Sequence, residues 1–219
     1  MNSKKTKLFK YNCGGILDDI NNYYEAKLKK YGPTFQGVDW NSKESQELRF
    51  DQLIQVIDMP DDNFSILDYG CGYGALYIFM KSKFPKFDFY GYDSSDAMIE
   101  KAINLNSNTE CSWFSDPINL SKTDYVIASG LFNVKQNYND DEWNEYVIDT
   151  LASLNTLAVK GFAFNLLTKY SDKDYMKNNL FYADPLYLFD YCKMNFSRNI
   201  ALLHDYSLYE FTILVRKGK

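Results

Sequence analysis

The apolar positions of the chain fall into two alternating patterns between residues 64 and 167. Short apolar runs with the length and composition of buried strands occupy 64–69, 87–92, 111–114, 125–129 and 158–167. Between them, apolar residues recur at helical spacing over 74–84, 95–105 and 140–154. Strands that alternate with helices in this way predict a doubly wound, mostly parallel α/β sheet.

The N-terminal part of the chain has the pattern of helices only. Two amphipathic helices are predicted over 16–30 and 43–58, and Gly32-Pro33 provides the stop signal between them. We expect residues 1–60 to form a helical lid that belongs to the same domain as the sheet of residues 61–219.

The C-terminal part adds a helix and a pair of strands. Asp184-Pro185 begins the helix, with a capping residue followed by proline in the first turn. Two apolar runs, 200–204 and 208–216, then follow with only a short turn between them, so they are antiparallel. The expected sheet is therefore seven-stranded, mostly parallel, with an antiparallel last strand.

A glycine-rich loop follows the first predicted strand. Asp68 ends the strand, and Gly70, Cys71, Gly72 and Gly74 form the turn before the next helix. Glycine tolerates positive φ and lets a ligand contact the backbone, and the start of the helix offers unpaired N–H groups. In doubly wound folds, ligands bind at the carboxyl ends of the strands, where this loop lies.

Two classes of cofactor are compatible with such a loop. A dinucleotide typically requires the spacing G-x-G-x-x-G, whereas this chain has glycine at alternate positions. The carboxylate of Asp68 is unfavourable for a pyrophosphate and suits a ligand with an ammonium group. S-adenosylmethionine (SAM) carries an ammonium group and a cationic sulfonium, so it is the favoured cofactor, and a nicotinamide dinucleotide remains the alternative.

The motif Asp68-x-Gly70-x-Gly72-x-Gly74 resembles motif I of the class I SAM-dependent methyltransferases, which have a Rossmann-like fold. Asp93, at the end of the second strand, is similar to the acidic residue that binds the ribose hydroxyls in that family, and a carboxylate can accept two hydrogen bonds from a diol. The resemblance places Ser94, Met98 and Asp116 beside the adenine. The whole chain looks like a bacterial subgroup that methylates small molecules.

In this family the N-terminal helices usually cover the cofactor. The resemblance therefore makes Tyr24, Tyr31, Trp40 and Arg49 candidates for closing the site or contacting the methionine end of SAM. Arg49 is equally compatible with a surface salt bridge. Ser129 begins the segment that, in the family, separates the cofactor from the methyl acceptor.

Candidates on the acceptor side are less distinctive. Asn133 follows the fourth strand and is expected to orient the acceptor. His204 is the only histidine and suits a general base, although a structural role is as compatible with its place near a strand end. Transfer to a carboxylate or phosphate oxygen requires no base. The segment after Ser129 also lacks the [DNS]-P-P-[YF] sequence of enzymes that methylate the amino groups of nucleic-acid bases.

The amino-acid composition limits the binding partners and cellular locations that we expect. The net charge is −5, which does not favour nucleic-acid binding. The four cysteines form no C-x-x-C pair, which suggests reduced thiols in a cytoplasmic protein without a metal site. We find no secretory signal and no apolar run long enough to cross a membrane.

These observations predict a SAM-dependent methyltransferase. We expect it to methylate an oxygen of a small polar or anionic metabolite, or of a cell-surface polysaccharide precursor. The alternatives are an NAD-dependent oxidoreductase, a SAM-binding protein without catalytic activity, and a methyltransferase of tRNA or protein. The sequence does not predict the oligomeric state.

Overall fold

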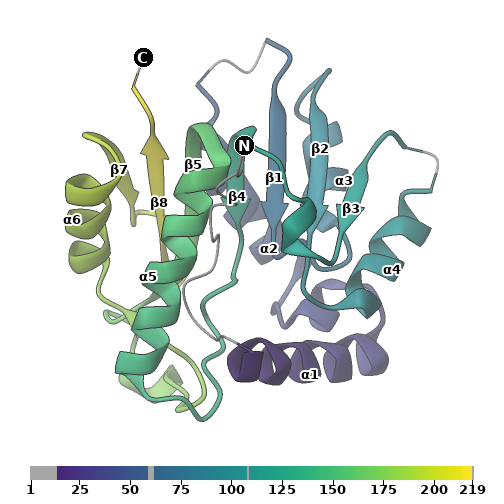
Figure 1. The fold of residues 1–219 in the computed structure, drawn as a ribbon. Coiled ribbons are helices and arrows are strands. Elements are labelled where there is room, and N and C mark those ends of the chain that lie inside the picture. The colour runs from purple at the N-terminus through teal and green to yellow at the C-terminus, as the bar shows by residue number, and fades with distance from the viewer. Residues whose placement is uncertain (1–13, 59–61, 108, 219) are drawn as a thin grey trace, which may run out of the picture.

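One twisted sheet forms the centre of the protein. The computed structural model describes residues 14–58, 62–107 and 109–218, so residues 1–13, 59 and 60 of the expected lid lie outside the described part. The sheet has eight strands, and Figure 1 shows it with helices in front and behind. The predicted doubly wound α/β fold is confirmed.

The order of the strands is β3-β2-β1-β4-β5-β8-β7, and the short β6 pairs with β5. All pairs are parallel except β5–β8 and β7–β8, so β8 is the single antiparallel strand of the seven-stranded path, as predicted. The strands are β1 (Ser65–Tyr69), β2 (Asp88–Tyr92), β3 (Ser112–Phe114), β4 (Thr123–Ala128), β5 (Ala158–Thr168), β6 (Tyr182–Ala183), β7 (Asn199–Leu203) and β8 (Glu210–Arg216).

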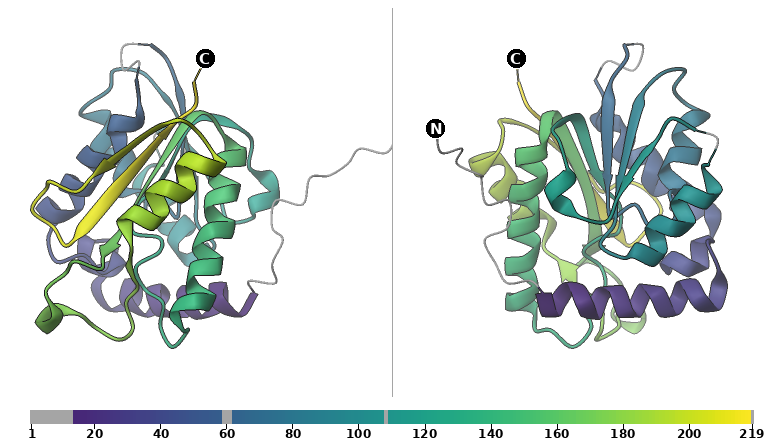
Figure 2. Two further views of the ribbon diagram at one scale, coloured as in Figure 1. Left: turned by 90° about the vertical axis from the view of Figure 1, so that its left-hand side faces the viewer. Right: turned by 45° about the vertical axis from the view of Figure 1, so that its right-hand side comes forward.

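The helices cover both faces and one edge of the sheet. Helices α5 and α6 pack on one face, α2 and α3 on the other, and α1 lies across the carboxyl ends of β1 and β2 (Figures 1 and 2). Within the described ranges, no helix is long and apolar enough to cross a membrane. The α-helices are α1 (Gly14–Tyr31), α2 (Lys43–Leu53), α3 (Ala75–Lys81), α4 (Asp96–Leu105), α5 (Asp140–Leu157) and α6 (Pro185–Asn195).

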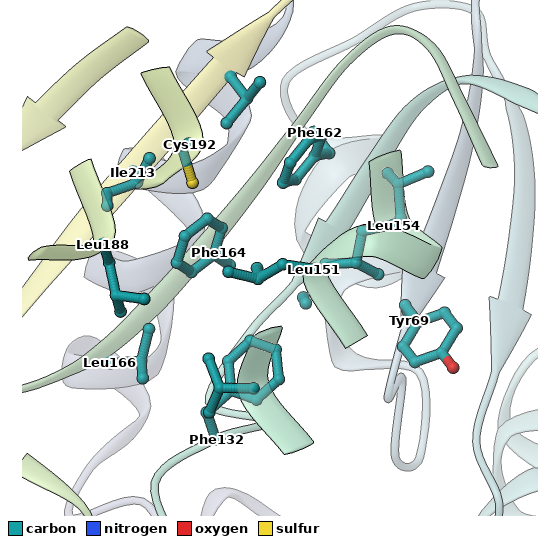
Figure 3. Close-up of a cluster of buried hydrophobic side chains, with 14 of the residues drawn as sticks. Tyr69, Phe132, Leu151, Leu154, Phe162, Phe164, Leu166, Leu188, Cys192 and Ile213 are labelled. Carbon is teal, nitrogen blue, oxygen red and sulfur yellow. The ribbon is translucent and has the colours of Figure 1, made fainter. Parts of the chain in front are cut away.

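Alternate residues of each central strand face opposite layers, because successive side chains of a strand point to opposite faces. In β4, Val126 belongs to the core cluster under α5 and α6, and Ile127 belongs to the cluster under α2 and α3. Figure 3 shows the first cluster, with Phe164 of β5 near Leu151 of α5 and Leu188 of α6. Burial on both faces explains why the strands are continuous apolar runs.

The structure differs from the expected elements in two places. Helix α2 ends at Leu53 and continues as a 3₁₀ turn (Ile54–Val56), so the predicted helix over 43–58 is too long. The segment expected to be a loop after β5 contains a 3₁₀ turn (Lys173–Tyr175) and β6. These pieces are too short to produce a periodic pattern in the sequence. Strand β6 pairs with the edge of β5 that is left free beyond the end of β4, since Leu167 already pairs with β8 on its other side.

We expect Phe164→Ala to lower the free energy of unfolding by about 3–5 kcal/mol, since it leaves a cavity in a close-packed core. Phe164 is fully buried, and its ring centroid lies 6.2 Å from those of Phe132 and Phe162. Urea denaturation measures the change. Ile118→Ala, at a side chain that is 70% exposed, is the control and should change stability by less than about 0.5 kcal/mol. Equal effects of the two substitutions would contradict the assignment of the core.

Candidate functional site

A cavity of about 350 Å³ lies at the carboxyl edge of the sheet. Its floor is the loop between β1 and α3 together with the ends of β2 and β4, and α1, α2 and the segment around Trp40 form the cover. Helix α1 crosses beneath β1 and β2 in Figure 1. This volume and position are typical of a small-molecule site in an open α/β sheet.

The glycine loop bends sharply at the floor of the cavity. Gly70, Gly72 and Gly74 have φ angles of 85°, 52° and 85°, in the left-handed region that favours glycine. The N–H groups of Gly70 and Cys71 donate to the carbonyl oxygen of Tyr92 at 2.7 and 2.9 Å. These bonds tie the loop to the end of β2, so the ends of the first two strands form one surface.

Two carboxyl groups lie on this surface. Asp68 is 3% exposed, and burial together with the charge of Asp93 raises its pKa to about 8. Asp93 accepts hydrogen bonds from the N–H groups of Gly72 (2.9 Å) and Ser95 (3.0 Å). Burial raises the pKa of Asp93 as well, although these hydrogen bonds oppose the shift. A cation bound between the two carboxyl groups would favour their ionised forms.

Helix α1 is attached to the loop after β2 by polar side chains. Ser94 Oγ donates to Asn21 Oδ1 at 2.6 Å, and Asn21 Nδ2 donates back to the Ser94 carbonyl at 3.2 Å. One turn further, Ser95 Oγ donates to Glu25 Oε1 at 2.7 Å. The cover of the cavity is thus anchored next to Asp93.

A second part of the cover is the segment before α2. Asp39 has a φ of 63°, and its carboxylate binds Lys27 of α1 at 2.6 Å and also accepts a hydrogen bond from Tyr23. The next residue, Trp40, lines the cavity beside Gly130. Asp39 therefore holds Trp40 at a fixed distance from α1.

Comparison with known proteins assigns this site to a family. The family model described as "Methyltransferase domain" matches residues 26–173. A protein of Mycobacterium tuberculosis (strain ATCC 25618 / H37Rv), named "Putative methyltransferase Rv1506c", is 46% identical over 162 residues, which cover 72% of this chain and 95% of that protein. The chain belongs to the methyltransferase family.

Solved methyltransferases share the fold. Magnesium protoporphyrin IX methyltransferase from Synechocystis PCC 6803, solved with bound SAM, is 14% identical and has a TM-score of 0.61, covering 93% of this chain and 96% of its own. Plantazolicin methyltransferase BpumL, solved with S-adenosylhomocysteine (SAH), is 13% identical with a TM-score of 0.58, covering 94% and 99%. At these identities the likeness concerns the fold alone.

Most of the cofactor residues expected from the sequence of this methyltransferase come together in the cavity. The wall includes Trp40, Asp68, Gly70, Cys71, Gly72, Asp93, Ser94, Met98 and Ser129. Cys71 is buried, and burial raises the pKa of its thiol well above the ordinary value, so it is not a thiolate nucleophile. No group of three His, Cys, Asp or Glu side chains in the described part of the chain could hold a metal ion.

Four expected cofactor residues lie outside the described cavity wall, and Arg49 is one of them. Gly74 begins α3, and a Cβ there would lie 2.6 Å from the Trp113 ring, so its role is close packing. Asp116 is exposed and caps a 3₁₀ turn by accepting a hydrogen bond from Ile118 N at 2.9 Å. Tyr31 ends α1, where Lys30 lies 4.7 Å from its ring centroid.

Arg49 was expected either to bind the cofactor or to form a surface salt bridge, and the structure shows neither. Its guanidinium group is bound to Glu210 inside the protein, at 2.7 and 2.9 Å. Its remaining nitrogen donates to the Ser45 carbonyl at 2.6 Å, so each of the three nitrogens has a partner within the protein.

The two residues expected on the acceptor side also lie outside the described wall. Asn133 is buried, and its side-chain oxygen accepts a hydrogen bond from Leu167 N at 3.1 Å, which joins the segment after β4 to β5. His204 is exposed, with its ring 6.0 Å from that of Tyr170. Both geometries are structural, and the catalytic roles stay predictions.

The sequence analysis missed several polar wall residues. Asn21 comes from α1, Gln46 from α2, and Thr150 from α5. Tyr73 also lines the cavity, and its hydroxyl donates to Gln46 Oε1 at 3.3 Å. A polar position on the apolar face of a helix is the only local signal that would have identified Gln46 and Thr150, which are both buried.

The pKa of Asp68 leads to a prediction about stability. An aspartate of an unfolded chain ionises near pH 3.9, while Asp68 in the folded protein ionises near pH 8. The raised pKa means that its contribution to stability is complete below about pH 3.9 and is lost as the pH rises to about 8. Asp68→Asn removes this loss, so the ligand-free variant should be more stable than the wild type at pH 8.

The stability gap should widen between pH 5 and 8, with an upper limit of about 1.4 kcal/mol per pH unit, and then level off. Thermal or urea denaturation of both proteins across this range measures the gap. Parallel pH profiles of the two proteins would contradict the raised pKa.

Proposed function

We propose that the protein transfers a methyl group from SAM to an oxygen of a small polar metabolite or of a polysaccharide precursor. The observation that carries the proposal is one cavity in which the glycine loop, Asp68 and Asp93 meet under α1. The family membership supports methyl transfer, and the geometry supports SAM as the donor. The charge of the cavity wall bears on the nature of the acceptor.

The residues of the cavity fit the chemical groups of SAM. Asp93, fixed by the N–H groups of Gly72 and Ser95, keeps free lone pairs that can accept hydrogen bonds from ribose hydroxyls. Asp68 is buried and suits an ammonium group, which would lower its raised pKa. Ser94 and Met98 lie at the same end of the cavity as Asp93 and are the proposed adenine contacts.

The charge of the cavity wall favours some cofactors and methyl acceptors over others. The charged side chains among its described residues are the carboxyls Asp68, Asp93 and Asp149. A dinucleotide would bring its pyrophosphate against these groups, whereas SAM brings a sulfonium and an ammonium. Two basic side chains outside the wall are already paired, Arg49 with Glu210 and Lys135 with Asp140, at 2.7 and 2.8 Å. Of the polar and anionic acceptors expected from the sequence, we therefore favour the uncharged polar class.

Under the proposed function, the protein aligns the two reactants and excludes water from them. SAM, when bound, supplies a methyl group that is already activated by the positive charge on sulfur. The apolar side chains of Leu17, Ile20 and Leu131 line the cavity and limit the access of water. Holding both reactants in line accounts for a large part of the rate enhancement in such a reaction. We assign no general base, because His204 lies outside the described wall.

Calorimetry tests the cofactor. We expect micromolar binding of SAM and SAH and no binding of NAD. Asp93→Asn should weaken SAM binding by about tenfold to a hundredfold, the loss expected for hydrogen bonds to a charged group. Asp96→Asn, at an exposed position three residues later, is the matched control and should bind as the wild type does. Binding of NAD without SAM would reject the proposed function.

A screen with SAM labelled in the methyl group tests the acceptor. Pairs of sugars and metabolites that differ only by a phosphate or carboxylate separate charge from shape, and we expect label in the uncharged members. Once an acceptor is found, His204→Ala should retain turnover. Labelling of the anionic members alone would overturn the preference for uncharged acceptors, and loss of turnover with unchanged SAM affinity would restore the general-base role of His204.

A further inference from the structure

A carboxylate outside the cavity holds two of its wall residues. Glu210 is the first residue of β8 and is 1% exposed. It pairs with Arg49 of α2 in a two-point contact, in which Nε and Nη2 of Arg49 donate to the two carboxylate oxygens at 2.9 and 2.7 Å. Both side chains are almost fully buried, at 7% and 1% exposure, so each neutralises the other inside the protein.

The first connection from Glu210 to the cavity runs through β5. Asn165 Nδ2 donates to Glu210 Oε2 at 2.5 Å, and Asn165 Oδ1 accepts a hydrogen bond from Gly130 N at 2.8 Å. Gly130 lines the cavity directly after Ser129. The position of the backbone at the end of β4 therefore depends on the buried carboxylate.

The second connection runs through Arg49 to Trp40. The guanidinium carbon lies 3.9 Å from the centroid of the Trp40 ring, which is the geometry of a cation–π contact. The two connections meet again, because a Cβ on Gly130 would lie 2.4 Å from the Trp40 ring. Glu210, Arg49, Trp40, Gly130 and Asn165 thus form a closed circuit, and only Trp40 and Gly130 face the cavity.

We propose that Glu210 and Arg49 are positioning residues that set the place of Trp40 and the net charge behind this wall. This inference rests on the proposed function, because its ligand is SAM. With Glu210 present, the guanidinium stacked on Trp40 is neutralised, and the wall can face a sulfonium cation. Without Glu210, an uncompensated positive charge lies directly behind a wall that has to accept a cationic donor.

A buried ion pair is weak evidence for a role in stability. Replacing a buried ion pair by uncharged groups of similar size is often neutral or stabilising, whereas removing one partner is strongly destabilising. Stability and ligand selection can therefore be separated by comparing a single with a double substitution. Glu210→Gln leaves Arg49 charged and keeps an oxygen for Asn165, and adding Arg49→Met removes the leftover charge.

The experiment compares the affinities for SAM and for SAH, which differ by the positive charge on sulfur. In Glu210→Gln we expect the affinity for SAM to fall about fivefold more than the affinity for SAH, the order expected for one uncompensated charge in a partly solvated cleft. In the double variant the ratio of the two affinities should return to the wild-type value. The matched control is Glu47→Gln, which breaks the exposed Lys43–Glu47 pair on the same helix.

A second readout follows Trp40 without any ligand. Protein labelled with 5-fluorotryptophan gives one ¹⁹F signal for each tryptophan, and Trp40→Phe identifies the signal of Trp40. We expect that signal to shift in Glu210→Gln and in the double variant, and to stay in place in Glu47→Gln. An unshifted Trp40 signal in Glu210→Gln would overturn the positioning role.

The affinity ratio separates the remaining outcomes. Equal losses for SAM and SAH in Glu210→Gln would mean that the pair serves stability only, and would overturn the charge argument. If the wild type binds neither ligand, the proposed function fails, while the Trp40 signal still decides whether Glu210 positions the wall.

Discussion

The burial of two neighbouring carboxyl groups at the carboxyl edge of the sheet is the constraint on which the site depends. Asp68 is almost fully enclosed, and this burial together with the charge of Asp93 raises its pKa to about 8. Asp93 stays in place because the N–H groups of Gly72 and Ser95 bind it. The positive φ angles of the glycine loop are required to aim the Gly72 N–H at that carboxylate. The edge is thus built at a cost in stability that a bound cation would offset.

The cover of the cavity is attached to the sheet in two chemically different ways. Near Asp93, hydrogen bonds join α1 to the loop after β2. Asn21 exchanges hydrogen bonds with Ser94, and the Glu25 carboxylate accepts one from Ser95. Near Trp40, the cover depends on the buried pair of Arg49 and Glu210. The first attachment is partly exposed and the second is buried, so local opening costs less at the first than at the second.

The sequence was sufficient for the features that are local in the chain. Strand–helix alternation predicted the sheet and its antiparallel strand, and the spacing of Asp68, Gly70 and Gly72 predicted the floor of the cavity. Pairings between distant residues were not predictable, because nothing near Arg49 in the chain indicates a partner 161 positions away. Asn133 and Gly74 lie outside the described cavity wall for a related reason, and their functional roles stay predictions. Each has a residue type found in functional motifs, yet tertiary packing against Leu167 and Trp113 explains its position.

The charge of the cavity also bears on how a catalytic cycle would end. Under the proposed function, methyl transfer removes the positive charge from sulfur, and the product SAH keeps only the ammonium group as a cation. The attraction of Asp68 and Asp93 for the ligand is therefore weaker after the reaction than before it. Neutralisation of Arg49 by Glu210 preserves this difference, since an uncompensated guanidinium would weaken the binding of the donor more than the binding of the product. An acidic cleft with a neutral outer wall thus favours both uptake of the donor and release of the product.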